Sequence, residues 1–552
     1  MILDTDVLVV GAGVAGLRSA IAAADQGVSV LLVSKKDIEK SGTTNADVAE
    51  MAGFNAAFPD NAKEVELHYQ DIVEAGQDVV DTKLAKIVAQ NAPQAMRELL
   101  DWDVDFEVEN GEMFVFQSCF STYPRTHVIK GHGRNIAVAL RREISKRKNI
   151  TVLTGVTIIG LLRGDAQCIG AYGILDGEKL TVQAKATILA SGGCGRAFKR
   201  SFSPSDVAGG AYEMAFQAGA VIQNLEFMQI GIGFSYPLVN IFNGYLWQGH
   251  PVLTDKTGKE IFSKILPEDV TPNDVFDAHV WHYPFSSRDN SKYLEIAINK
   301  AISKGLGSEN GGISVDMRHM TDSYVANLSK DSGISHMWPL ARDFILSRGV
   351  NLLDQKVEVA CFQHAMNGGI KIDQHAESTI PGLYAVGECA GGPHGADRLG
   401  GNMFVTSLVF GKIAGENAAN QSKKIQTLPE ADLHSKEELI HKYELMYKKV
   451  DFKGVLKELQ QKSQNSLLVE RTQDGLEEMI IFSQSVNNIL ESAPTSKVLE
   501  PKNYDLLSIA KTTWLISKSA LERKESRGSH HRSDYPTKDL KFNHIIEQVK
   551  QG

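Results

Sequence analysis

The stretch Asp6-Val7-Leu8-Val9-Val10-Gly11-Ala12-Gly13-Val14-Ala15-Gly16 decides the fold of this chain. An apolar run ends in three glycines with the spacing G-x-G-x-x-G, and an alanine-rich segment follows it. This pattern predicts a buried parallel strand over residues 6–10, a tight turn, and a helix over residues 14–25. A second apolar run, Val28 to Val33, completes a β-α-β unit of about thirty residues, the length that such a unit needs.

The glycine turn predicts a nucleotide site. Gly11 allows the tight turn, Gly13 lets the backbone approach a pyrophosphate, and Gly16 lets the helix pack closely on the strand. The amino end of the helix would then stabilise the diphosphate charge. The acid that usually binds ribose after the second strand is replaced by Ser34-Lys35, which argues mildly against NAD.

A second glycine-rich segment lies nearly four hundred residues further on. The strand Gly382-Leu383-Tyr384-Ala385-Val386 leads into Gly387-Glu388, and the loop His394-Gly395-Ala396-Asp397-Arg398-Leu399-Gly400-Gly401-Asn402 follows. We expect this strand to join the same sheet and Glu388 to contact a hydroxyl group of the nucleotide. A surface carboxylate is the alternative reading of Glu388. The loop would carry charged groups to the reactive end of the nucleotide.

Composition limits the class of protein. The 552 residues allow two to four domains, and 43% hydrophobic with 23% charged residues is ordinary for a globular protein. A net charge of -9 and a pI near 6.0 argue against nucleic acid and anionic membranes as partners. The basic stretch from Arg523 to Arg532 is short and mixed, which favours a solvated or buried, paired face.

Targeting and cysteine patterns add further expectations. No apolar run reaches about 18 residues, so no direct membrane insertion is expected. The first residues form a strand rather than a signal peptide. The five cysteines are scattered without a C-x-x-C pair, which disfavours disulfides, zinc, iron–sulfur ligation and any other metal site in this chain. These features predict the reducing cytoplasm.

Hydrophobic periodicity outlines the rest of the chain. Residues 63–100 have a helical period that breaks near Gly76, residues 149–162 alternate as strands, and residues 179–190 are expected to form a strand pair. From about residue 226 to 352, aromatics and turn signals indicate an inserted mixed α/β domain. Beyond residue 430 the chain is charged and helical in period, for example over 443–464 and 473–490.

Several specific strings occur in an order that resembles a known family, the flavoprotein subunits of succinate dehydrogenase and fumarate reductase. L-aspartate oxidase and the adenylylsulfate reductase flavoprotein are its cousins. The resemblance covers the whole chain and rests on Gly11–Gly16, Val33-Ser34-Lys35, Ala190-Ser191-Gly192-Gly193-Cys194-Gly195, Leu225-Glu226-Phe227-Met228-Gln229, Ser287-Arg288-Asp289, His364 before Gly368-Gly369-Ile370, Gly387-Glu388, His394 to Asn402, Glu525-Ser526-Arg527-Gly528 and Asp534-Tyr535-Pro536.

The resemblance implies an α/β fold: a Rossmann-like FAD-binding domain, an inserted α+β capping domain and a C-terminal helical domain. The expected boundaries are 1–225 and 353–429 for the two parts of the FAD-binding domain, 226–352 for the capping domain and 430–552 for the helical domain. The residues expected to bind FAD are Gly11, Gly13, Ala15, Gly16, Ser34, Lys35, Ser41, Thr43, Thr44, Ser191, Gly192, Gly193, Glu388 and Asn402.

The family also implies chemistry, in which a hydride passes between flavin N5 and a carbon next to a carboxylate. Arg288 matches the family's proton donor, while His364 and Arg398 match the residues that hold a substrate carboxylate. A planar guanidinium with a histidine suits a carboxylate. The resemblance implies a small carboxylate-bearing substrate. An iron–sulfur electron-transfer subunit is expected as partner, through which the protein could be peripheral to a membrane.

The sequence departs from the family at three places. The histidine that binds flavin covalently is missing from Lys40-Ser41-Gly42-Thr43-Thr44, so FAD is expected to be non-covalent. This absence favours reduction, or an oxidation other than that of succinate, as the reaction. Gly231 replaces a histidine for a second substrate carboxylate. The family's Thr-Glu-x-x-Arg-Gly-Glu loop reads Asn243-Gly244-Tyr245-Leu246-Trp247-Gln248-Gly249. We therefore expect a substrate with one carboxylate, or a comparable anion, and with a far end that is less acidic, larger or more apolar. Tyr245 and Trp247 are the candidate residues for the pocket wall around that end. The alternative is that residues 243–249 do not correspond to the family's loop, because this part of the chain is variable.

Three functions remain open from the sequence. A fumarate-type or enoate reductase is the leading one. Chemistry like that of adenylylsulfate reductase, with a sulfur substrate, is the second. A non-catalytic electron-transfer flavoprotein subunit is the third, and the joint retention of Arg288, His364 and Arg398 argues against it.

Overall fold

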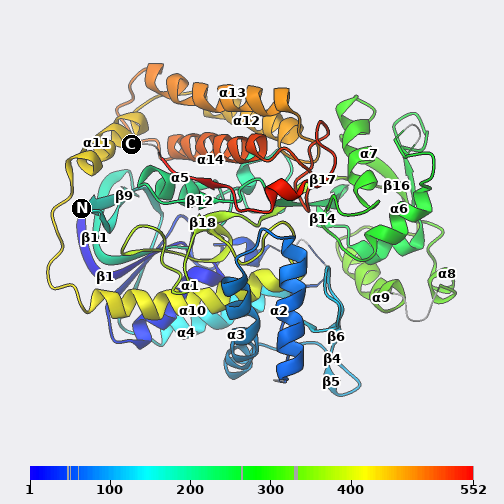
Figure 1. Ribbon diagram of the computed structural model, residues 1–552, viewed down its shortest axis with the longest axis horizontal. Helices are drawn as coiled ribbons and strands as arrows, with labels where there is room; N and C mark the ends of the chain where they lie inside the picture. Colours follow the sequence, from blue (N-terminus) through cyan, green and yellow to red (C-terminus); the bar gives the residue numbers. More distant parts are fainter. Residues whose placement is uncertain (47–48, 50, 60, 263–264, 329–332, 551–552) are drawn as a thin grey trace.

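A β-sheet, seen at the left of Figure 1, organises the chain in the computed structural model. The structure describes residues 1–552 except 47–48, 50, 60, 263–264, 329–332 and 551–552. The sheet has seven strands in the order β8-β2-β1-β11-β10-β9, and β19 also pairs with β11. Their bounds are β1 Ile2–Val10, β2 Val30–Ser34, β8 Ile150–Thr154, β9 Val156–Gly164, β10 Gln167–Leu175, β11 Glu178–Leu189 and β19 Leu383–Ala385.

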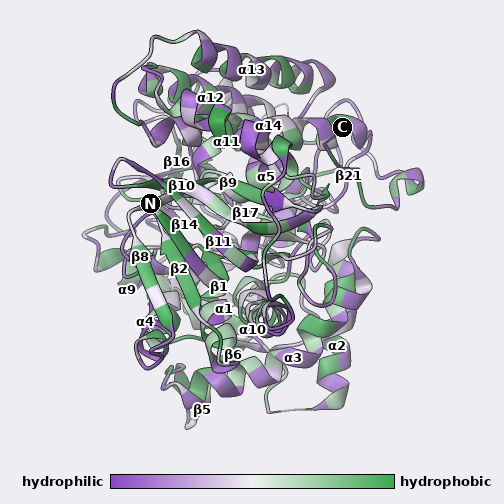
Figure 2. Cartoon of the chain, turned by 90° about the vertical axis from the view of Figure 1, so that its left-hand side faces the viewer, coloured by the Kyte–Doolittle hydropathy of each residue, from purple (hydrophilic) through white to green (hydrophobic). Residues whose placement is uncertain are grey.

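The predicted β-α-β unit is confirmed. β1 pairs in parallel with β2 and β11, so Val7 lies opposite Val30 and Val10 opposite Leu189. Strand β19 also runs parallel to β11, which brings the second glycine segment to the same edge of the sheet as the first. Apolar colouring is concentrated on these inner strands in Figure 2, as expected for a sheet covered on both faces.

Helices cover both faces of the sheet. α1 (Val14–Asp25) packs along α10 (Asn402–Ser422) and also against α4 (His132–Ser145), while α5 (Gly210–Gln217) and α11 (Leu433–Met446) pack on β9. The helical run predicted for residues 63–100 is two helices, α2 (Ala62–Gly76) and α3 (Thr82–Asp101). The strand pair predicted for residues 179–190 was wrong, because β11 is one continuous strand whose antiparallel partner is β10.

A second sheet lies in the segment expected to form the capping domain, residues 226–352, which we call the capping region and which is the green part of Figure 1. Its order is β14-β13-β17-β16-β15, and β13 pairs antiparallel with β17. The third strand in this order, β17, comes from beyond the expected boundary at residue 352. Its pairing with β13 therefore joins the capping region to the part of the chain that leads back to the first sheet. The elements are β13 Met228–Tyr236, β14 Asn240–Ile241, η3 Gly244–Gly249, β15 Val252–Thr254, α6 Pro272–His279, α7 Lys292–Ser303, β16 Ile313–Asp316, α8 Asp322–Ala326, α9 Gly333–Leu346 and β17 Val357–Met366.

Four helices form most of the chain after residue 430. The helix predicted over 443–464 is interrupted, because α11 ends at Met446 and α12 (Phe452–Ser466) begins only after Asp451, whose carboxylate accepts the Gly454 N–H as an N-cap. α13 (Gln473–Ser492) matches the prediction, and α14 (Lys502–Glu522) was not predicted. α14 is mostly buried, so it lacks the one-sided apolar pattern of a surface helix.

Shorter elements complete the chain. They are η1 Thr43–Asn45, β3 Gly53–Asn55, β4 Val108–Glu109, β5 Glu112–Met113, β6 Val115–Phe116, β7 Thr126–Val128, η2 Gly195–Ala197, β12 Ile222–Gln223, β18 Gly369–Lys371, η4 Gly387–Cys389, β20 Ala390–Gly391, η5 Leu540–Phe542 and β21 Glu547–Gln548. None of the described helices has an apolar stretch long enough to cross a membrane. Among the same residues, no group of three or more His, Cys, Asp or Glu side chains is arranged to hold a metal ion.

Candidate functional site

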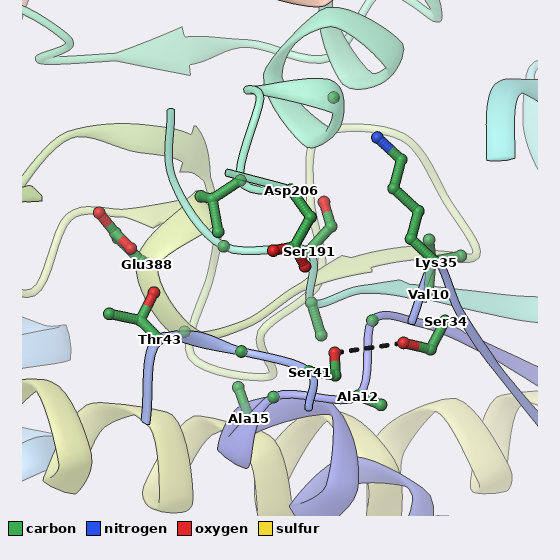
Figure 3. Close-up of a pocket in the computed structure, with 18 of the residues that line it drawn as sticks. Val10, Ala12, Ala15, Ser34, Lys35, Ser41, Thr43, Ser191, Asp206 and Glu388 are labelled. Carbon is green, nitrogen blue, oxygen red and sulfur yellow. Dashed lines mark hydrogen bonds between the residues drawn. The ribbon is translucent and has the colours of Figure 1, made fainter. Parts of the chain in front are cut away.

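A deep cavity lies beyond the carboxyl ends of β1, β2 and β11 (Figure 3). It encloses about 1090 Å³ of space between protein atoms, part of it open to solvent. Eleven of the fourteen residues expected to bind the cofactor line it: Gly11, Gly13, Ala15, Ser34, Lys35, Ser41, Thr43, Thr44, Ser191, Gly192 and Glu388.

The glycine turn has the geometry that a pyrophosphate requires. Gly11 has φ +114°, and a Cβ atom there would lie 2.4 Å from the Ala190 carbonyl oxygen. A Cβ on Gly16 would lie 1.8 Å from the Gly11 oxygen, so Gly16 sits under the turn and does not line the cavity. A Cβ on Gly13 would meet only the Gly42 Cα atom, at 3.8 Å. The turn therefore leaves the amino end of α1 open to the cavity, where an anion can bind.

Glu388 lies at the cavity wall and is fixed by two backbone donors. Its carboxylate accepts the N–H of Gly193 at 3.2 Å and the N–H of Met366 at 2.9 Å. Burial raises the pKa of Glu388 above its usual value, although both hydrogen bonds act in the opposite direction. Gly193 thus holds Glu388 and is not itself a lining residue. The arrangement positions a carboxylate for a ligand hydroxyl.

Asn402 does not reach the cavity. It begins α10, and its side-chain oxygen lies 3.0 Å from Nε2 of His68. Its neighbours Met403 and Ser407 line the cavity instead.

The C-terminal helices supply lining residues that the sequence did not reveal. Tyr504 and Ser508, one turn apart on α14, line the cavity, as does Asp206. Asp505 on the same helix accepts hydrogen bonds from Lys35 at 2.5 Å and from Arg196 at 2.6 Å. The i, i+4 spacing of Tyr504 and Ser508 is the signal in the sequence that they share one face of a helix. Nothing in the neighbouring sequence shows that this face of α14 lies near the ends of β1 and β2.

Arg288 is held by a buried carboxylate. Its Nη2 and Nε atoms donate to Oδ2 of Asp397 at 2.9 and 3.2 Å, and its guanidinium lies 4.5 Å from the ring centre of Phe120. Asp397 is 1% exposed and its Oδ2 also accepts from Gln77 and Ser286, while its Oδ1 is buried without a hydrogen-bond partner. Asp397 was not singled out from the sequence.

Arg398 follows Asp397 in the loop 394–402, which we call the reactive loop, and it is a buried cation. Its Nε and Nη2 atoms donate to Oε1 of Gln229 at 2.9 and 2.6 Å, and Nη1 donates to the Leu399 carbonyl at 3.1 Å. All these partners are neutral. Burial lowers the pKa of Arg398 to about 10. Burial and the Arg398 charge lower the pKa of His364 to about 3, so His364 is a neutral imidazole near neutral pH.

Tyr245 and Trp247 lie within the core of the capping region. Trp247 is 0% exposed, with its ring stacked on Phe242 at 4.3 Å and on Phe276 at 5.5 Å between ring centres. Tyr245 is also buried and packs beside Gly333. The structure therefore does not bring these two expected wall residues to His364. The ring that contacts His364 from the capping region is Tyr283, at 5.6 Å.

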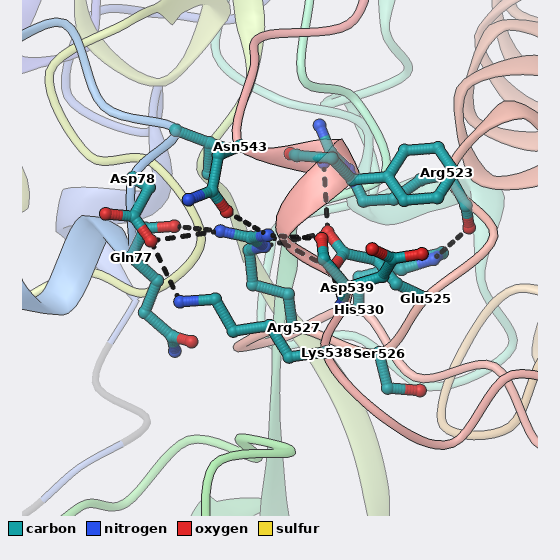
Figure 4. Close-up of polar contacts among 12 residues, drawn as sticks. Gln77, Asp78, Arg523, Glu525, Ser526, Arg527, His530, Lys538, Asp539 and Asn543 are labelled. Atoms are coloured by element: carbon teal, nitrogen blue, oxygen red, sulfur yellow. Dashed lines mark hydrogen bonds and ion pairs between the residues drawn. The ribbon is translucent and has the colours of Figure 1, made fainter.

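The basic stretch 523–532 is buried and paired, as one of the two sequence interpretations expected (Figure 4). Arg527 donates to both oxygens of Glu525 and to the Gln77 carbonyl. The side chain of Gln77 in turn donates to Asp397. Arg523 donates to Glu226 at 2.6 Å, at the beginning of the capping region.

The turn after Arg527 contacts the reactive loop directly. Ser529 donates to the Ala396 carbonyl, and the Gly528 carbonyl accepts the N–H of Ser287 at 2.7 Å. This segment thus joins the reactive loop to the capping region.

Comparisons with known proteins agree with this arrangement. The family model described as FAD binding domain matches residues 6–404, and that described as fumarate reductase flavoprotein C-term matches residues 456–545. The chain is 28% identical to one subunit of the fumarate reductase (CoM/CoB) of Methanothermobacter marburgensis, over 97% of this chain and 95% of the relative. It is 25% identical to L-aspartate oxidase of Yersinia pestis, over 96% of each chain. The solved structure of Mycobacterium smegmatis Sdh1 in complex with UQ1 superposes with a TM-score of 0.81 at 27% identity, covering 100% of this chain and 92% of that one.

Proposed function

The chain belongs to the FAD-binding flavoprotein family of fumarate reductases and succinate dehydrogenases, and from this premise we propose that it transfers a hydride between flavin N5 and a carbon adjacent to a substrate carboxylate. It is an FAD-dependent oxidoreductase. The proposal concerns the class of substrate and the residues that act on it.

The observation that carries the proposal is the charge of Arg398. A buried cation normally has a buried anion beside it, because an unpaired charge is costly to desolvate. Among the described residues no carboxylate forms a salt bridge with Arg398, whereas Arg288 has Asp397. The Arg398 guanidinium has five N–H groups, and only part of this donor capacity is used. Glu388 acts on Arg398 only through space, as a negative charge that raises its pKa against the effect of burial. A substrate carboxylate would supply the direct ion pair that Arg398 lacks among the described residues, and the neutral imidazole of His364 can add a further contact.

The protein residues then have separate tasks. Bound reduced FAD supplies a hydride equivalent from N5. Arg398 and His364 hold the carboxylate and draw charge toward it, so that the remote alkene carbon accepts hydride. Arg288 gives a proton to the other alkene carbon, which converts C=C to C–C while the flavin is oxidised. Asp397 holds Arg288 in position and favours its return to the protonated form.

FAD fits the cavity on two observations of this chain. The glycine turn leaves space that side chains would fill, and Glu388 is fixed where it can accept a hydroxyl hydrogen bond. The described residues that line the cavity include no histidine or cysteine. We propose that FAD is held without a covalent bond and that reduction is the physiological direction.

We also propose that electrons arrive through a partner protein with an iron–sulfur cluster. The relative from Methanothermobacter marburgensis is named as one subunit of a larger enzyme, and the described part of this chain holds no metal-binding cluster of its own.

Anaerobic reoxidation tests the proposal. Photoreduced enzyme is mixed with a panel of 2-enoates and of keto and imino acids, and flavin absorbance is followed in a single turnover. We expect reoxidation by at least one 2-enoate, and loss of this reaction in Arg398→Gln with FAD content unchanged. If no carboxylic acid reoxidises the flavin and sulfite instead bleaches it in an AMP-dependent manner, the proposal is wrong and sulfur chemistry replaces it.

A further inference from the structure

Tyr283 fills the space in which a side chain at position 231 would begin. Gly231 lies on β13 opposite Phe362 of β17. A Cβ atom built on Gly231 would lie 1.9 Å from the Tyr283 hydroxyl oxygen and 2.1 Å from Cζ of the same ring. These distances are far below van der Waals contact, so the glycine and the tyrosine require each other. Position 231 can carry a side chain only if Tyr283 becomes smaller or moves.

Aromatic rings surround this point. The Tyr283 ring meets His364 edge-on at 5.6 Å, and Phe202 meets the same imidazole at 5.9 Å. Phe202 and Phe362 are stacked at 4.6 Å with an interplanar angle of 16°. Together with Ile241 and Ala360 these rings form a buried apolar cluster. One side of the imidazole is therefore bordered by hydrocarbon.

His364 has both a cation and uncharged rings near it. Burial, together with the charge of Arg398, lowers the pKa of His364 to about 3, so the imidazole is neutral near neutral pH. The Phe202 and Tyr283 rings that contact it, and the Phe362 ring stacked on Phe202, carry no charge. The Tyr283 backbone N–H is held by the sulfur of Cys119, which accepts it at 3.0 Å and so fixes the start of this residue. A second substrate carboxylate placed among these rings would meet hydrocarbon and the neutral Tyr283 hydroxyl rather than a cationic side chain of the cluster.

We propose that Tyr283 is the residue that determines specificity in this site, and that the substrate is a monocarboxylic 2-enoate whose end remote from the carboxylate is an aryl or similarly apolar group. This assignment rests on the proposed function. The carboxylate binds at Arg398, and the apolar end contacts the Tyr283 ring and the cluster behind it. An aromatic contact contributes about 2- to 10-fold in affinity beyond its area. A charged far end would lose its solvation and would meet no cation in this cluster, only the neutral Tyr283 hydroxyl.

The test compares two ligands on the oxidised holoenzyme. Cinnamate and fumarate share the 2-enoate group but differ at the far end, and each is titrated while the flavin spectrum is recorded. We expect cinnamate to bind about 10- to 150-fold more tightly, the range for one charge-assisted contact made or missed. Tyr283→Phe should change cinnamate affinity less than about threefold, because the ring makes the contact.

A double variant tests the assignment in the opposite direction. Tyr283→Ala clears the space, and adding Gly231→His places an imidazole there. Fumarate affinity should rise about 10-fold or more in the double variant relative to Tyr283→Ala alone. Gly231→His alone should not gain fumarate binding, because Tyr283 blocks the side chain. Tyr236→Ala is the matched control, since Tyr236 lies on the same strand β13 but is 49% exposed, and it should leave both affinities unchanged.

The outcomes separate the two proposals. Tighter binding or faster reduction of fumarate than of cinnamate in the wild type overturns the Tyr283 assignment and leaves the proposed function in place. A double variant that holds its flavin but gains no fumarate affinity also overturns the assignment. Failure of every 2-enoate to perturb or reoxidise the flavin overturns both.

Discussion

Replacing Asp397 with asparagine tests how Arg288 is held. In Asp397→Asn, the amide oxygen must occupy the Oδ2 position, because four donors from Gln77, Ser286 and Arg288 converge there. The amide nitrogen then falls at the Oδ1 position, which is buried and has no partner. Two charge-assisted contacts to Arg288 become neutral-acceptor contacts, each weaker by about 1 kcal/mol. A loss of about 2 kcal/mol in the placement of the donor corresponds to roughly 30-fold in kcat.

The same substitution should move KM in the other direction. Removing a negative charge beside Arg288 leaves the site more cationic, so an anionic substrate should bind more tightly and KM should fall. Steady-state kinetics with the best 2-enoate from the reoxidation panel measure both constants. Asp316→Asn is a suitable control, because Asp316 pairs with Arg318 at the surface of the capping region. An Asp397→Asn enzyme with kcat within threefold of the wild type, or with kcat lowered only in proportion to lost flavin, would refute this role.

Four further predictions concern the cofactor and the charges. Acid precipitation should release all flavin as free FAD, and Gly13→Val should yield a folded protein without flavin, because its side chain enters the cavity rather than the core; circular dichroism and flavin absorbance report the two properties. Arg288→Lys should retain FAD but reduce single-turnover reoxidation by about 10²- to 10⁴-fold, and a smaller loss would count against a donor role. Ligand affinity should show no step near pH 6.5, because the pKa of His364 is lowered to about 3, and it should fall as the pH rises through about 10, where Arg398 loses its proton; a clear step between pH 5 and 8 in spectral titrations would contradict this assignment.

The parts of the fold that were predictable from the sequence are those with a local cause. The strand, glycine turn and helix around Gly11 follow from the spacing of apolar residues and glycines alone. α14 was missed because burial on nearly all sides removes the amphipathic period. The interruption between α11 and α12 depends on a single N-cap residue, Asp451. Hydrophobic periodicity, which is judged over a window of many residues, does not detect a single capping residue.

The lining of the cavity could be predicted from the strings that match the family, and less so where long-range packing decides. Eleven of the expected cofactor residues line the cavity, Arg288 is paired with Asp397, and Arg398 is a buried cation with neutral partners. The roles expected for these residues stay predictions. Trp247 was expected at the substrate, but three aromatic rings in the capping core stack together instead. The place of Tyr283 could not be recognised from the sequence, because it depends on the bridge between Gly231 and Pro284 and on the absence of a side chain at position 231.

The hydrogen bond between Ser529 and Ala396 sets an order of events during protein synthesis. A growing chain contains most of the cavity residues, the capping region and the reactive loop long before it contains the segment that joins them. At about 5–20 residues per second, the delay between Ala396 and Ser529 on the ribosome is on the order of ten seconds. During that interval the loop bearing Asp397 and Arg398 lacks its last support, and the cavity lacks Tyr504 and Ser508 of α14. Both ends of the site are therefore completed only after the helical region has been translated.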